Sequence, residues 1–161
     1  MAKQIKLIKK KCFVLMVARK FPATHPNKGT PTLFPDKINT GNKRHTVREN
    51  YALWVARAEV VNAGLGYVSL RYWSGKPYAS EQIEFGRLYY IHVQKVHIYP
   101  LETNKRYFNR RYNIFVDTKI VPLKWPFLFA AHDGLSYADF KGWFKKPLED
   151  AALIQFTQFK Y

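Results

Sequence analysis

The sequence predicts a single α+β domain, on three observations. Its 161 residues fit one domain, and 47% of them are hydrophobic against 24% charged, which is enough apolar material to bury a core. Apolar residues at helical spacing indicate one helix, and a capping pattern indicates another. The rest of the chain contains several segments rich in aromatic and β-branched residues, the composition typical of strands.

The first part of the chain combines a basic arm, a strand and a long loop. Residues 2–11 hold five lysines and no acid, so we expect residues 1–11 to form a basic arm ahead of one domain, residues 12–161. The apolar run 12–18 predicts a strand and is too short to span a bilayer. Prolines and glycines from residue 22 to residue 35 predict a loop. His25, inside this loop, is expected at the surface or in a turn.

Two helices follow from periodicity and capping. After Asn50, a suitable N-cap, apolar residues recur at helical spacing and predict a helix; these residues are Tyr51, Trp54, Val55, Ala58 and Val61. Gly64 lies just beyond the end of this helix. Ser136 with Asp139 three residues later is similar to a capping box, and predicts a second helix that stops at Pro147.

The remaining regular segments read as strands over 67–73, 83–99, 112–121 and 153–159. Within 83–99 the alternation of apolar residues changes parity between Val93 and Val96, which predicts a bulge or a break. Long bent strands of this kind are typical of barrels.

The charge of the chain points to a polyanionic partner. Lysine and arginine outnumber the acids by 27 to 11, a net charge of +16, and the chain has 12 Phe, 11 Tyr and 4 Trp. Cations beside flat rings suit RNA or single-stranded nucleic acid. The single cysteine, Cys12, excludes an intrachain disulfide and indicates a reducing, cytoplasmic location. We expect no membrane partner, and the sequence gives no indication of an oligomeric state.

The sequence lacks the signature motifs of several enzyme classes. The chain has no phosphate-binding GxxxxGK[ST] loop, no dinucleotide-binding GxGxxG turn, no GxSxG elbow and no HExxH. His92 and His97 are five residues apart, which puts them on opposite faces of a strand. We therefore expect neither a metal nor a cofactor.

One short stretch, GNKRHTVRE at 41–49, concentrates polar chemistry just before a helix. It holds Lys43, Arg44, His45, Thr46 and Arg48 within six positions. Such a cluster can bind a phosphate or a carbonyl oxygen, and the alternative is a solvated basic loop. A lysine crowded by Arg44 and Arg48 is expected to have a lowered pKa.

This stretch resembles the signature of the ASCH domain, a family of PUA-like β-barrels, through Gly41, Lys43, Thr46, Val47 and Arg48. The setting is similar too, because Asp133 precedes Leu135 and Ser136, a short helix and a final strand. The resemblance runs from Phe13 to the end. It departs from a minimal ASCH domain in the basic arm, in residues 25–36 and around residues 105–125. It implies an α+β barrel of about five or six strands with two main helices, and a small cleft for RNA or a modified nucleoside.

The resemblance also implies a possible hydrolase. One ASCH branch is similar to acetylcytidine amidohydrolases, which use a lysine, a threonine and a glutamate; these fall on Lys43, Thr46 and Asp133 as catalytic residues, with aspartate one methylene shorter. Another branch resembles single-strand ribonucleases. The same side chains also serve plain binding. We therefore interpret the chain as a nucleic-acid-binding protein, the alternatives being an amidohydrolase on an acylated cytidine-type nucleoside, then a ribonuclease. A basic protein that docks on an acidic protein is a third class.

Further nucleic-acid contacts are expected outside the motif. Trp73 and Lys76, at the end of a strand, could stack a base and hold a phosphate, unless Trp73 packs under the turn. Four cations, Lys105, Arg106, Arg110 and Arg111, interleave with aromatic residues and predict a nucleic-acid track or a solvated cationic loop. In residues 141–146, KGWFKK, the lysines lie opposite the apolar face, which favours a solvated helix surface.

Overall fold

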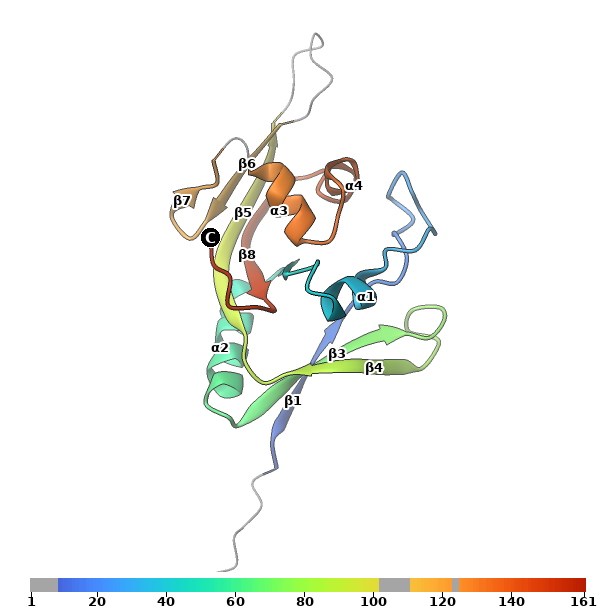
Figure 1. Cartoon of the computed structure of the whole chain (residues 1–161), viewed down its shortest axis with the longest axis vertical. Helices are drawn as coiled ribbons and strands as arrows, with labels where there is room; N and C mark the ends of the chain where they lie inside the picture. The colour runs from blue at the N-terminus through green and yellow to red at the C-terminus, as the bar shows by residue number, and fades with distance from the viewer. Residues whose placement is uncertain (1–8, 102–110, 123–124) are drawn as a thin grey trace, which may run out of the picture.

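The computed structural model describes residues 9–101, 111–122 and 125–161, and Figure 1 shows their arrangement. Its strands are β1 (Lys11–Met16), β2 (His45–Arg48), β3 (Gly66–Trp73), β4 (Gln82–Leu88), β5 (His92–Leu101), β6 (Arg111–Val116), β7 (Lys119–Ile120) and β8 (Leu148–Gln155). Its helices are α1 (Phe34–Asn39), α2 (Tyr51–Asn62), α3 (Pro126–His132) and α4 (Tyr137–Trp143). The predicted α+β class is confirmed.

The described strands form two open sheets instead of the expected closed barrel. One sheet has the order β1-β3-β4 and the other β2-β8-β5-β6-β7. In the first, β1 runs parallel to β3, and in the second every described pair is antiparallel. The two sheets contain eight described strands, and the structure has four described helices, more than the five or six strands and two main helices that the resemblance implies.

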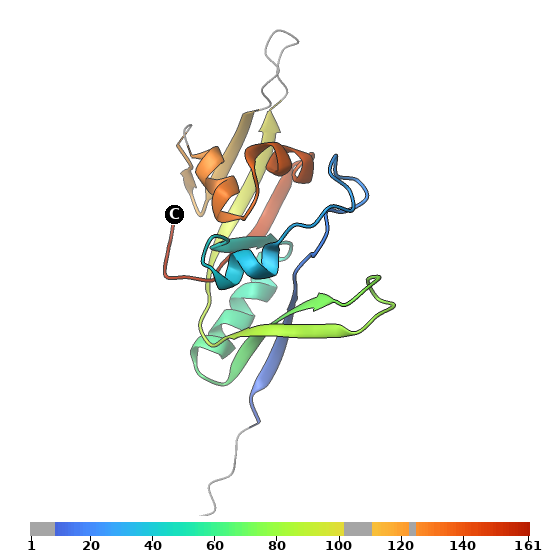
Figure 2. The ribbon, with the colours of Figure 1, turned by 45° about the vertical axis from the view of Figure 1, so that its right-hand side comes forward.

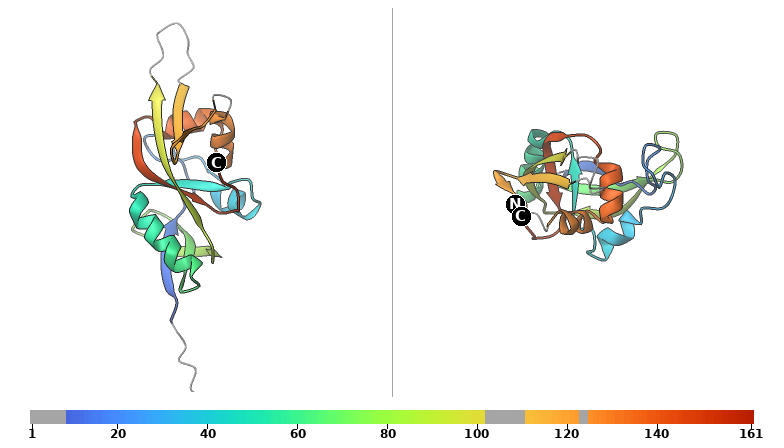
Figure 3. Two further views of the ribbon diagram at one scale, coloured as in Figure 1. Left: turned by 90° about the vertical axis from the view of Figure 1, so that its left-hand side faces the viewer. Right: turned by 90° about the horizontal axis from the view of Figure 1, so that it is seen from above.

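The segment predicted as one bent strand, 83–99, contains both a break and a bulge. The chain leaves β4 after Leu88 and enters β5 at His92, and the side chain of Asn62 secures the break by bonding both backbone groups of Ile91, at 2.9 and 3.0 Å. The pairing of β5 with β8 then shifts between Val96 and Ile98. This bend carries the chain from one sheet into the other, as the left view of Figure 3 shows.

Two other predicted strands have different limits. Segment 112–121 is split into β6 and β7 by a turn in which Asp117 has φ 54°. The last strand occupies Leu148–Gln155, earlier than the predicted 153–159, because Ala151 to Ile154 fill the core between β2 and β5.

Helix α2 joins the two sheets. It begins as predicted after Asn50, whose side-chain oxygen accepts a hydrogen bond from the amide of Leu53 at 3.0 Å. Trp54, Ala58 and Val61 are buried in a cluster that also contains Leu15 of β1 and Ile154 of β8. The same apolar face of α2 therefore stabilises both sheets.

Helices α1 and α3 are not among the predicted elements. Each has a proline in its first turn, Pro35 or Pro126, where the missing N–H costs nothing. The predicted helix at Ser136 is present as α4, because the Ser136 hydroxyl accepts from the amide of Asp139 at 3.0 Å. None of the helices in the described part of the chain is long and apolar enough to cross a membrane.

The proline-rich loop between β1 and α1 has a fixed structure. Lys20 and Pro31 form an antiparallel bridge at its base. His25 lies in a turn, one of the two positions predicted for it, since its carbonyl accepts from the amide of Lys28 at 3.1 Å. The other predicted position, at the surface, is wrong. His25 is 3% exposed, because its ring stacks on Phe21 at 4.3 Å and its Nε2 lies 2.9 Å from the carbonyl oxygen of Asp139. Figures 1 and 2 show this loop on the same side of the molecule as the β3–β4 hairpin, with α4 on its other flank.

Candidate functional site

Lys43 and Asp133 form a buried ion pair, 90 residues apart in the chain. The Lys43 ammonium lies 2.5 Å from both the Oδ1 carboxylate oxygen and the backbone oxygen of Asp133. It also lies 4.3 Å from the centre of the Phe34 ring. The two side chains that the sequence assigns to one site are therefore in direct contact.

The backbone fixes both partners. The amide of Lys43 donates to the carbonyl of Lys37 at the end of α1, at 2.8 Å, and the amide of Arg44 donates to the carbonyl of His132 at 2.7 Å. Asp133 follows the last residue of α3, and Gly134 ends that helix with φ +75°. A Cβ at Gly134 would stand 3.1 Å from the Cβ of Lys43, so a glycine lets the α3 end approach the lysine stem.

Thr46 and Arg48 complete the cluster from β2. The guanidinium of Arg48 donates to the Thr46 hydroxyl at 2.9 Å, to the carbonyl of Val47 at 2.8 Å and to the carbonyl of Met16 at 2.7 Å. Thr46 is 4% exposed. Alternation along the strand places both side chains on the same face, because they are two residues apart.

These four residues line a cavity of about 30 Å³, together with apolar side chains that include Phe34, Trp143 and Phe144. That volume holds about one water molecule, whereas pockets for small organic ligands measure about 300–1,000 Å³. The motif therefore forms a polar cavity and not the nucleoside-sized cleft that the resemblance implies. Aromatic side chains form part of its wall.

Burial sets the protonation of this cluster. It lowers the pKa of Lys43, an effect opposed by Asp133 and reinforced by the charges of Arg48 and Lys37. It also raises the pKa of Asp133, against the opposing charge of Lys43. The lowered lysine pKa agrees in direction with the sequence-based prediction, but its main cause is desolvation. The charge of Arg48 acts in the same direction but ranks below burial and the opposing effect of Asp133.

The other two motif residues point elsewhere. Arg44 is exposed, and its guanidinium lies 6.0 Å from the Phe159 ring. His45 is fully buried, with Nε2 3.1 Å from the Tyr161 hydroxyl, so a direct contact of His45 with nucleic acid is excluded in this structure. Alternation along β2 places His45 on the opposite face from Thr46 and Arg48, and Arg44 precedes the strand; neither residue lines the cavity.

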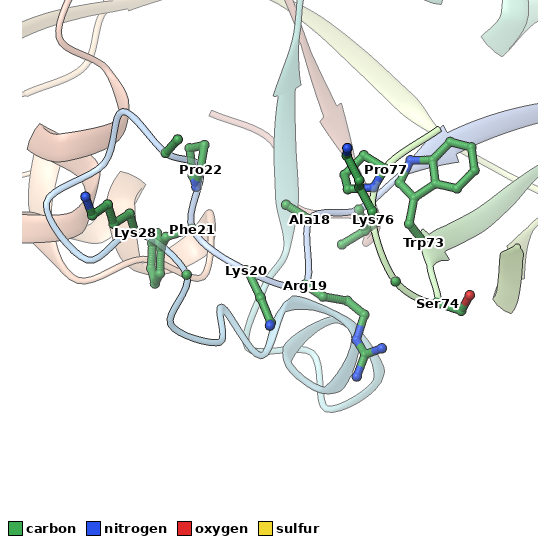
Figure 4. A pocket seen from close by; sticks show the side chains of 14 residues that line it. Ala18, Arg19, Lys20, Phe21, Pro22, Lys28, Trp73, Ser74, Lys76 and Pro77 are labelled. Atoms are coloured by element: carbon green, nitrogen blue, oxygen red, sulfur yellow. The ribbon is translucent and has the colours of Figure 1, made fainter. Parts of the chain in front are cut away.

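A larger groove, which we call the indole groove, lies between the β1–α1 loop and the β3–β4 hairpin. It has a volume of about 900 Å³. Among the described residues that line it, four are cationic and none is acidic; the cations are Arg19, Lys20, Lys28 and Lys76. Figure 4 shows Lys28 and Pro22 on the loop and Lys76, Pro77 and Trp73 on the hairpin, with Ala18 and Arg19 between them.

The hairpin presents Trp73 at this groove. Trp73 is half-buried and lies 5.3 Å, centre to centre, from the ring of Tyr78, which is 91% exposed. The indole is therefore neither a core residue nor fully free. The turn is held by the Ser80 hydroxyl, which accepts from the amide of Gly75 at 2.9 Å and donates to the carbonyl of Lys76 at 2.8 Å.

Sequence reasoning found part of this groove. Trp73 and Lys76 are predicted site residues and do line it, whereas Arg19, Lys20 and Lys28 are not among the predicted residues. Their signal was the basic pair that follows the first strand and a lysine in a loop with no acid between residues 20 and 35. The predicted cations Lys105, Arg106 and Arg110, and the side chain of Arg111, lie outside the described residues, as do residues 1–8 of the basic arm.

Within the described ranges, no group of three or more His, Cys, Asp or Glu side chains is placed to hold a metal ion. The resemblance to ASCH domains remains a prediction that rests on residues 41–48, Asp133 and their order in the chain. In comparisons with protein-family models, curated proteins and solved structures, nothing matches this chain.

Proposed function

We propose that the protein binds single-stranded nucleic acid, RNA foremost, in the indole groove. The observation that carries this proposal is the lining of the groove, in which the described residues include four cations, no acid and the partly exposed indole of Trp73. Cations that follow a phosphate backbone, with an aromatic ring for a base, are the two parts of a single-strand site. The net charge of +16 adds long-range attraction.

The groove is a better site for this purpose than the motif. A cavity of about 30 Å³ cannot take a base, whereas about 900 Å³ is in the range of ligand sites. The guanidinium of Arg19 lies 4.8 Å from the ring centre of Tyr72, so one groove cation is partly pre-positioned. The motif residues then act beside the bound strand and not as its main contact.

Binding is expected to be strongly salt-dependent and to need Trp73. Fluorescence anisotropy with labelled oligouridylate, measured over a salt series, should give a log–log slope that Lys76→Ala reduces by about 1, because each phosphate contact releases counterions. Trp73→Ala should cost about 1–3 kcal/mol through the lost stacking. Trp125→Ala, in which the exposed indole does not line the groove, serves as the matched control.

Any of three results would remove the proposal. One is an affinity that does not change with salt, or no binding at low salt. Another is equal loss in Trp73→Ala and Trp125→Ala, which would place the contact outside the groove. The third is tight binding to an acidic protein with no affinity for oligonucleotides, which would favour the docking alternative.

A second candidate is an amidohydrolase acting on an acylated cytidine-type nucleoside. The observation that favours it is the convergence of Lys43, Thr46 and Asp133 on one small polar cavity. For this role the Lys43 ammonium must first pass a proton to the Asp133 carboxylate, a transfer favoured by the lowered pKa of the lysine and the raised pKa of the aspartate. The neutral amine can then take a proton from the Thr46 hydroxyl, which makes threonine a nucleophile. A nucleoside would have to displace an aromatic wall residue such as Phe144 to reach Thr46.

Release of acetate from acetylcytidine tests this candidate directly. An enzyme would lose turnover in Thr46→Val while keeping its fold, because one oxygen is exchanged for a methyl group of similar size, and Thr40→Val, on an exposed turn, would keep it. Proton NMR of the released acetate measures the rate. Absence of acetate with the wild-type protein would leave the cluster with a binding or structural role only.

A further inference from the structure

A second groove lies on the opposite flank of the β1–α1 loop, against α4. It has a volume of about 570 Å³, and its lining includes Thr24, Arg48, Glu49, Lys145 and Lys146. Both lysines are exposed. Among the described residues of this lining the charge is therefore three cations against one acid, and we call it the lysine groove.

The linings of the two grooves meet at consecutive residues of the β1–α1 loop, Ala23 and Thr24, which we call the ridge. Ala23 lines the indole groove, and Thr24, the next residue, lines the lysine groove. Figures 1 and 2 show the same order in space, with the loop between the β3–β4 hairpin and α4. A single strand that crossed the ridge from the indole groove would therefore reach the lysine groove.

The ridge is held in place by His25 of the same loop, by α4 and by Lys145. His25 is buried under it, with its Nδ1 accepting from the amide of Asn27 at 3.0 Å and its Nε2 bonded to the carbonyl of Asp139 on α4. A Cβ at Gly142 would stand 2.5 Å from His25 Nε2, so the loop sits directly on the helix. The ammonium of Lys145 donates to the carbonyl of Thr24. These contacts hold the ridge against α4, between the two grooves.

We propose that a single strand bound in the indole groove crosses the Ala23–Thr24 ridge and continues into the lysine groove, where Lys146 contacts its backbone phosphates. This inference rests on the proposed function. The occupant is argued from charge and continuity, since the lysine groove adjoins a cationic groove and is itself net positive. Residues 141–146 are then part of the interface and not merely a solvated helix surface.

The extended path has a consequence for the motif. Arg48 lines the lysine groove and also the cavity that holds Lys43, Thr46 and Asp133, and Trp143 and Phe144 are shared in the same way. A nucleotide in the lysine groove therefore lies against the wall of that cavity. Among the described residues, Arg48 is therefore the cation that lines both the lysine groove and this cavity.

Oligonucleotide length tests the inference. Oligouridylates of about 4 and about 12 nucleotides bracket common single-strand site sizes. Lys146→Gln should reduce the salt slope for the long oligonucleotide by about 1 and leave that of the short one unchanged. Lys141→Gln is the control, because Lys141 lies on α4, a few residues before Lys146, and does not line the groove. Lys145 is left intact because it holds the ridge.

The outcomes separate this inference from the proposed function. Wild-type protein that binds neither oligonucleotide would overturn both. Binding of both lengths with an unchanged slope in Lys146→Gln, or with equal changes at the two lengths, would overturn the extended path and leave the indole groove as the whole site. Equal effects of Lys146→Gln and Lys141→Gln would also overturn it, since they would show only a general effect of charge.

Discussion

Replacing Asp133 with alanine is expected to lower the free energy of unfolding by about 3–5 kcal/mol, the usual cost of leaving one member of a buried ion pair unpaired. Lys43 is 2% exposed and Asp133 5%, and they are bonded at 2.5 Å. Without the carboxylate, the ammonium has to lose its proton or draw water into the core. Urea unfolding measures the change.

Two comparisons identify the cause. Asp36→Ala removes an exposed carboxylate from the first turn of α1 and is expected to cost less than about 1 kcal/mol. The double variant Lys43→Met with Asp133→Leu removes both charges and should recover most of the lost stability, because replacing a buried pair by apolar side chains is often neutral or stabilising. An Asp133→Ala protein as stable as Asp36→Ala would contradict burial of the pair.

Acidification should destabilise the protein through a buried histidine. Burial, with the charges of Lys43 and His132 nearby, holds the pKa of His45 well below its ordinary value of 6.5. The contribution of a group with a depressed folded pKa is fully present above its unfolded pKa and is lost as the pH falls through the folded one. For each proton that only the unfolded chain binds, the free energy of unfolding decreases by about 1.4 kcal/mol for every unit by which the pH is lowered.

The surroundings of His45 support the neutral form. The Tyr161 hydroxyl lies 3.1 Å from His45 Nε2 and 3.0 Å from His132 Nδ1, and a single hydroxyl proton can be donated to only one of them. Burial also lowers the pKa of His132 and raises that of the Tyr161 hydroxyl. This network therefore carries no positive charge on its rings at neutral pH.

Unfolding free energies from about pH 7.5 to about pH 5 test this in the wild type and in His45→Gln. The variant should show a flatter dependence on pH whatever its absolute stability. Asp133 acts in the opposite direction, because burial raises its pKa and its contribution is lost as the pH rises, but both proteins share it. Parallel curves for the two proteins would assign the acid sensitivity to other groups.

The helices that the sequence predicts correctly are those whose signals are local. Asn50 and Ser136 cap their helices through their own side chains, and both starts are where capping predicts them. Helices α1 and α3 have no such signal, because Leu33 and Trp125 stand at their N-caps without a side-chain bond. There the prolines read as loop formers, although their fixed φ suits a first helical turn.

The candidate sites divide in the same way. Lys43, Thr46 and Arg48 lie within six residues, so a single motif predicts that they share a site. Asp133 is distant in the sequence and is predicted to join them only from the order of the ASCH-like segments. The indole groove depends on two segments about 50 residues apart, around Lys20 and Trp73, whose meeting is set by the parallel pairing of β1 with β3. Nothing in either segment alone reports that meeting.

The pairing of β2 also determines when the motif is assembled as the chain folds. Among the described strands, β2 pairs with β8, which joins Thr46 to Ile154 across more than 100 residues. Contacts between such distant parts of a chain form late, because the entropy of closing the loop is lost before they add stability. During synthesis, Thr46 therefore has no sheet partner until the Leu148–Gln155 segment has left the ribosome.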